Sequence, residues 1–136
     1  MLDTHCHIDL YPRPTHVLNE CEKSDFPVIS MTNLPSHFEM GLPFFQNLRK
    51  VRQALGMHPL YAEHHRTEFP KFINNLEKTS YIGEIGLDFS KDGIKTKDLQ
   101  LETFENILGL ISGKKKILSV HSRLAERQIF DLLKKY

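Results

Sequence analysis

The sequence has few cysteines, almost no net charge and no long apolar run. Its 136 residues include two cysteines, Cys6 and Cys21, without a secretory leader. This argues against a disulfide framework and predicts a reducing, cytoplasmic compartment. No apolar run approaches the roughly 20 residues needed to cross a membrane, so we predict no membrane partner. A formal net charge of +1 gives no broad attraction for nucleic acid, and such a substrate would need a local site.

Strand-like apolar runs alternate with segments of helical spacing, and no linker or low-complexity segment divides the chain. The patterns predict strands at 1–5, 27–31, 51–56, 81–88 and 117–121, and helices at 15–23, 37–50, 69–76, 101–111 and 124–136. Gly41 and Pro43 suggest that the second helix begins irregularly. Ile129, Leu132 and Leu133 are expected on the inner side of the last helix.

These consecutive βα units predict an α/β fold with about five parallel strands in one domain, residues 1–136. No glycine-rich phosphate loop follows the first strand, and polar residues occur at the ends of several strands. Both features favour a TIM barrel over an open sheet. In a barrel the strand ends converge on one mouth, where active sites lie.

The first strand carries a pair of histidines. His5 and His7 are two residues apart, so their side chains point the same way, while Cys6 faces away and packs behind the strand. Histidine is the commonest metal ligand in proteins. Two of the chain's eight histidines could also share a strand by chance. The metal-binding interpretation of the pair therefore depends on residues further along the chain.

Those residues are Glu84 and His121. A carboxylate inside an apolar strand is costly unless it is paired or bound to a cation, and the flanking Gly83 and Gly86 leave open space around it. The alternatives are a structural ion pair for Glu84 and a capping or core role for His121. Together, three imidazoles and one carboxylate suit Zn²⁺ or Mn²⁺, and a bridging carboxylate would let two ions sit side by side.

At these motifs the chain resembles the TatD family of metal-dependent deoxyribonucleases, which are TIM-barrel metal hydrolases. The matching stretches are Asp3-Thr4-His5-Cys6-His7-Ile8-Asp9, Gly56-Met57-His58-Pro59, Gly83-Glu84-Ile85-Gly86-Leu87-Asp88 and Val120-His121-Ser122-Arg123-Leu124-Ala125, with Gln100 and Phe104 also in family positions. Within the family, the stretches at 10–12 and 116–123 are similar to the TatD-related component of Qat anti-phage defence systems.

The resemblance implies a site for two divalent ions, Zn, Mn or Mg, that hydrolyses DNA phosphodiesters. It implies that His5 and His7 bind one ion, that His121 binds the other, and that Glu84 bridges them as the catalytic carboxylate. For three further residues the alternatives stay open. His58 and Arg123 either contact phosphate or are a turn histidine and a surface arginine, and Asp88 either orients a ligand or caps its loop.

Family members have two further ligands, a histidine on strand six and an aspartate on strand eight, without counterparts here. The resemblance therefore implies the N-terminal part of a barrel, an open edge that exposes apolar surface, and weak or absent nuclease activity from this chain alone. A partner protein, a second copy or the rest of a longer product would cover the edge.

The alternative function is a catalytically impaired homologue that serves as a structural subunit of a defence complex, with other Qat components as partners. Two other histidine-pair families fit less well. Many amidohydrolases have a carbamylated lysine where Glu84 stands, and the stretch at 83–88 fits the PHP phosphoesterases poorly.

Overall fold

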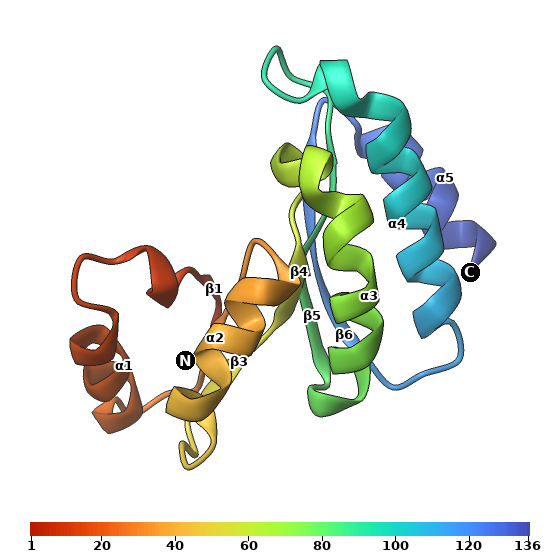
Figure 1. The fold of residues 1–136 in the computed structure, drawn as a ribbon. Helices are drawn as coiled ribbons and strands as arrows, with labels where there is room; N and C mark the ends of the chain where they lie inside the picture. The colour runs from red at the N-terminus through yellow and green to blue at the C-terminus, as the bar shows by residue number, and fades with distance from the viewer.

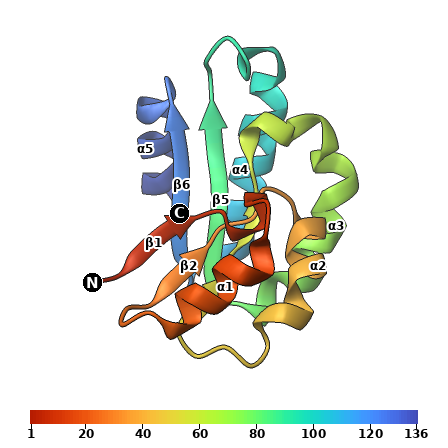
Figure 2. The same ribbon diagram turned by 90° about the vertical axis from the view of Figure 1, so that its left-hand side faces the viewer.

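Six parallel strands form two three-stranded sheets in the computed structural model, which describes residues 1–136. The first sheet contains β1 (Asp3–Cys6), β2 (Val28–Ser30) and β3 (Val51–Gln53), in that order. The second contains β4 (Leu55–Met57), β5 (Tyr81–Asp88) and β6 (Ile117–Arg123). Figure 2 shows β5 and β6 side by side and running in the same direction. The predicted α/β fold of parallel βα units is confirmed, as part of a barrel.

The predicted strand at 51–56 is divided into β3 and β4 by Ala54, which gives six strands where five were expected. Just after β2, the backbone at Thr32 forms hydrogen bonds with β5 of the second sheet. Thr32 N donates to the Gly83 carbonyl oxygen (3.3 Å), and Glu84 N donates to the Thr32 carbonyl oxygen (3.2 Å). These two bonds join the sheets directly beside Glu84.

The helices follow the strands as predicted, with shifted ends. They are α1 (Pro14–Lys23), α2 (Pro35–Phe45), α3 (His65–Asn75), α4 (Lys97–Ile111) and α5 (Glu126–Lys135). The expected irregular start of the second helix is wrong: α2 begins at Pro35, a favourable first helical residue, and Pro43 lies near its end. None of the helices combines the length and the apolar character that crossing a bilayer would require.

Figure 1 shows α3, α4 and α5 lying along the second sheet. They enclose the main core, whose largest fully buried side chains include Phe72, Phe104 and Ile82. In α5, Ile129 is buried, but Leu133 is 40% exposed, contrary to expectation. The reason is that α5 covers β6, the last strand of its sheet, and no further strand lies beyond it.

A smaller cluster packs behind β1. Cys6 lies against Ile8, Leu18 and Val28, and its Sγ donates to the Ile29 carbonyl oxygen. Burial raises the pKa of the Cys6 thiol to about 12. Cys6 therefore points away from the face that carries the two histidines, as the alternation of side chains on a strand predicts.

Both outer strands leave apolar groups exposed. Ile117 at the start of β6 is 59% exposed and Leu2, just before β1, is 54% exposed. Unpaired strand edges with exposed apolar side chains are sites at which another chain can pair. The expected open edge is therefore present in the structure.

Gly56 lies where the backbone allows no side chain. A Cβ at this position would be 1.6 Å from the Thr32 carbonyl oxygen. We expect Gly56→Ala to lower the free energy of unfolding by about 3 kcal/mol, because backbone atoms must move apart. The control is Gly109→Ala, in α4, where the nearest atom to the added Cβ is 3.7 Å away. It should raise stability by about 0.5–1 kcal/mol. Urea unfolding measures both, and equal effects would contradict the close approach at Gly56.

Candidate metal centre

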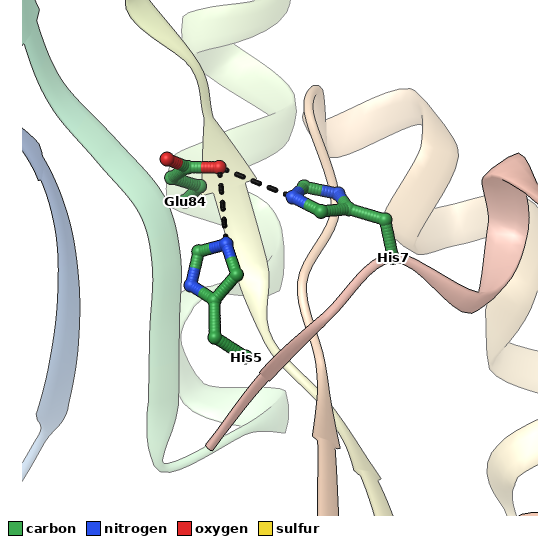
Figure 3. Close-up of side chains that lie close together, drawn as sticks. All are labelled: His5, His7 and Glu84. Carbon is green, nitrogen blue, oxygen red and sulfur yellow. Dashed lines mark hydrogen bonds and ion pairs between the residues drawn. The ribbon is translucent and has the colours of Figure 1, made fainter. Parts of the chain in front are cut away.

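The carboxylate of Glu84, on β5, lies among four histidine rings. Its Oε2 is 3.1 Å from His7 Nε2, 3.4 Å from His5 Nε2 and 3.6 Å from His58 Nε2, and its Oε1 is 2.8 Å from His121 Nδ1. Figure 3 shows His5 and His7 reaching the same oxygen from β1 and the residue after it. Residues from the first, third, fourth and fifth predicted strand units thus meet at one point.

Burial of Glu84 raises its pKa, but the hydrogen bonds from His121 and His7, together with the neighbouring His58 and His5, lower it more. The net pKa lies far below the ordinary value, so the group is a carboxylate. Its ion-pair partners are all histidines.

The donor atoms fit a divalent cation. Two overlapping groups, His5 with His7 and Glu84, and His58 with Glu84 and His121, each have one ligand atom per residue, all within 4.8 Å of one another. Imidazole nitrogens with a carboxylate oxygen are the ligands of Zn²⁺ and similar ions. Because Glu84 belongs to both groups, its carboxylate can contribute a ligand to each of two metal positions.

His121 is held from both sides. Its Nδ1 faces Glu84, and its Nε2 is 3.0 Å from Asp88 Oδ2. Its pKa is raised by the hydrogen bond to Glu84, with burial opposing and Asp88 adding to the rise. The other oxygen of Asp88 accepts the backbone N–H of Ser90 at 2.9 Å. Asp88 therefore both contacts a proposed ligand and caps its loop, the two roles that the sequence left as alternatives.

Gln100, on α4, fixes the strand end that carries Asp88. Its Oε1 accepts the Asp88 N–H at 2.8 Å, while its Nε2 donates to the Gly93 carbonyl oxygen and to Thr96 Oγ1. It is fully buried. Sequence reasoning noted Gln100 only as a family position, because no local pattern shows that its amide reaches a loop seven residues earlier.

His58 Nε2 lies 3.6 Å from Glu84 Oε2, without a hydrogen bond between them. Its Nδ1 accepts the backbone N–H of Leu60 at 3.2 Å, so the neutral ring carries its proton on Nε2, the atom that faces Glu84. Burial lowers the pKa of His58 to about 4, with the Glu84 charge opposing. The ring is therefore neutral, and it presents an N–H, not a lone pair, to the site.

His65 supports the turn that holds His58. Its Nε2 donates to the His58 carbonyl oxygen at 3.0 Å, and its Nδ1 is 3.0 Å from Thr103 Oγ1. Burial lowers its pKa, and the bond to the His58 carbonyl only partly offsets this.

An unfolded histidine titrates near about 6.5, so as the pH falls through this value the unfolded chain takes up a proton that the folded protein does not. We expect the free energy of unfolding, measured with urea, to fall more steeply between about pH 7 and about pH 5.5 in the wild type than in His65→Gln, by at most about 1.4 kcal/mol per pH unit. Parallel profiles of the two proteins would contradict this assignment.

Arg123 is not among the residues that form ion pairs with Glu84. It is exposed at the end of β6, in register with Asp88 on β5. The structure thus gathers His5, His7, His58, Glu84, His121 and Asp88 and leaves the side chain of Arg123 in solvent.

Parallel βα units with histidines and a carboxylate at one mouth define the class of TIM-barrel metal hydrolases. Residues 2–136 match the family described as TatD related DNase. The chain belongs to this family, and the predicted resemblance to the TatD family is confirmed.

Relatives of the chain are longer. It is 31% identical to an uncharacterized metal-dependent hydrolase of Buchnera aphidicola subsp. Baizongia pistaciae, over 98% of this chain and 54% of that protein. It is 26% identical to the human 3'-5' RNA nuclease TATDN2, over 99% of this chain and 20% of that protein. The crystal structure of YJJV, a TatD homologue from Escherichia coli K12, matches with a TM-score of 0.85 and 25% identity, over 99% of this chain and 55% of that one. The chain thus spans about half the length of the Buchnera relative and of YJJV.

Proposed function

We propose that residues 1–136 form the N-terminal part of a TatD-like barrel that hydrolyses DNA phosphodiesters with two divalent cations, Zn, Mn or Mg. The observation that supports this most directly is the Glu84 carboxylate, which has imidazole nitrogens on both oxygens and lies at the meeting point of distant strands. Divalent ions in such sites polarise the scissile phosphate and lower the pKa of a water molecule.

The proposed roles follow from the contacts. His5 and His7 face Oε2 of Glu84 and would hold one cation, whereas His121 faces Oε1 and would hold the other. A cation would replace the proton on His121 Nδ1, and the bond from Nε2 to Asp88 would keep the ring in place. Glu84 is the proposed catalytic bridging group.

Two residues are proposed to bind the substrate. His58 directs its Nε2–H into the cluster and can donate to a phosphate oxygen. Arg123, exposed at the end of the same strand as His121, can reach a neighbouring phosphate along an extended single strand. The human relative is named as an RNA nuclease, so DNA and RNA oligonucleotides should be compared directly.

The second candidate is a structural subunit of a cytoplasmic anti-phage defence complex, of the Qat kind. The exposed apolar side chains on the outer strands favour it, because a protein partner or a second copy could pair with either edge. In this case the histidine cluster would bind metal weakly or not at all, and activity without the partner would be low.

Three measurements on the purified chain separate the candidates. We expect bound divalent metal by elemental analysis, with weak cleavage of single-stranded DNA by the chain alone and a native mass above that of a monomer. A metal-free protein that also fails to bind added Zn²⁺ would contradict the hydrolase function. Strong metal-dependent cleavage by a monomer would contradict the need for a partner.

A further inference from the structure

A serine on the last strand contacts a histidine on the first. Ser119 Oγ is 2.8 Å from His5 Nδ1, although β1 and β6 belong to different sheets and stand at their outer edges. Figure 3 shows the His5 ring with one nitrogen toward Glu84 and the other turned away from it. The Ser119 hydroxyl contacts this second nitrogen, Nδ1.

The neighbourhood leaves room for this contact. Ser119 is in the same strand as His121, two residues before it, so both side chains point to the same face. Across the sheet, the Cβ of an alanine at Gly83 would be 2.8 Å from Ser119 Cβ and 2.7 Å from Met31 Sδ. The missing side chain at Gly83 therefore leaves Ser119 space beside the metal centre.

His5 needs such a restraint more than the other proposed ligands. Its side chain is 42% exposed, against 21% for His7 and 19% for His121. Packing alone therefore leaves its ring the most freedom to rotate. Of the other two, His121 has Asp88 on its second nitrogen, whereas His7 Nδ1 is buried with no partner.

We propose that Ser119 is a positioning residue for His5. Its hydroxyl oxygen accepts the Nδ1–H, which fixes the ring orientation and leaves the Nε2 lone pair facing Glu84 for a cation. This inference rests on the proposed metal-binding function and adds a residue that orients one ligand. The contact between His5 and Ser119 also joins the edge strands β1 and β6 across the site.

The first test compares Zn²⁺ affinities of four purified proteins by competition with a chromophoric chelator. Ser119→Ala should bind about tenfold more weakly, the low end for a residue that orients a metal ligand. Ser119→Thr keeps the hydroxyl and should remain within about threefold of the wild type. The matched control, Ser80→Ala, removes an exposed hydroxyl in the turn before β5 and should change nothing. Unchanged affinity in Ser119→Ala would overturn the proposal, even if its stability falls.

The second test uses the metal-free protein and NMR. In the wild type and in Ser119→Thr we expect nuclear Overhauser effects between the His5 ring and residue 119, with one ring orientation. In Ser119→Ala the ring should average over several orientations. If the wild type binds no Zn²⁺, the proposed function fails, and this measurement still decides whether Ser119 holds the ring. Averaging in the wild type would overturn the inference.

Discussion

Glu84→Gln should reduce Zn²⁺ affinity by more than about a hundredfold, beyond the 10- to 100-fold typical of residues that only orient a ligand. The carboxylate faces all four histidines of the cluster. Glutamine has nearly the same shape but removes the negative charge and one of the two ligand oxygens, so it cannot bridge two cations. Isothermal titration with Zn²⁺ measures the change.

The matched control is Glu102→Gln, at an exposed position of α4, which should bind Zn²⁺ like the wild type. Circular dichroism and urea unfolding establish that both variants are folded. Because a glutamine oxygen can still accept from His121, we expect Glu84→Gln to fold. Wild-type affinity in this variant would exclude Glu84 as a ligand and leave it as a structural partner of the histidines.

His58→Ala should leave Zn²⁺ affinity within about threefold of the wild type and weaken binding of a single-stranded DNA oligonucleotide by about 10- to 100-fold. This loss of DNA affinity corresponds to the loss of one hydrogen bond to a charged group. The reason is the direction of the His58 proton: Leu60 N–H occupies Nδ1, so Nε2 carries the hydrogen. A donor suits a phosphate oxygen and not a cation. Fluorescence anisotropy in the presence of Zn²⁺ measures the DNA affinity.

His64→Ala is the control, since His64 is an exposed histidine in the same turn. It should change neither affinity. If His58→Ala instead loses Zn²⁺ binding while oligonucleotide binding follows the metal, then His58 is a ligand of the second group of donors and the Leu60 contact breaks on metal binding.

The proposed centre was largely visible in local sequence patterns. The two-residue period of a strand placed His5 and His7 on one side and Cys6 on the other. The strand at 81–88 was predicted with the bounds it has in the structure, and Glu84 stood out because a carboxylate is unexpected in an apolar run. The barrel topology then followed from repeated βα units, since parallel strands bring their ends to one mouth.

Other features had no local signal. The division of the third predicted strand depends on how closely Thr32 passes Gly56, which is a contact between units. The exposure of the Arg123 side chain also had no local signal, because it depends on β6 being the last strand of its sheet. The period of two could have placed Ser119 on the face of His121, but not beside His5.

The sequence by itself predicted that His5 and His7 share one face of their strand and that Glu84 interrupts an apolar strand, because strand alternation and hydrophobic periodicity are properties of consecutive residues. Only the tertiary structure decided what each ring nitrogen contacts: Ser119 for His5, Asp88 for His121 and Leu60 for His58. In His5 and His121 the partner comes from another strand, and in His58 it comes from the folded turn. Such pairings are set by the curvature of the sheets and the close approach of backbones, which depend on the whole chain.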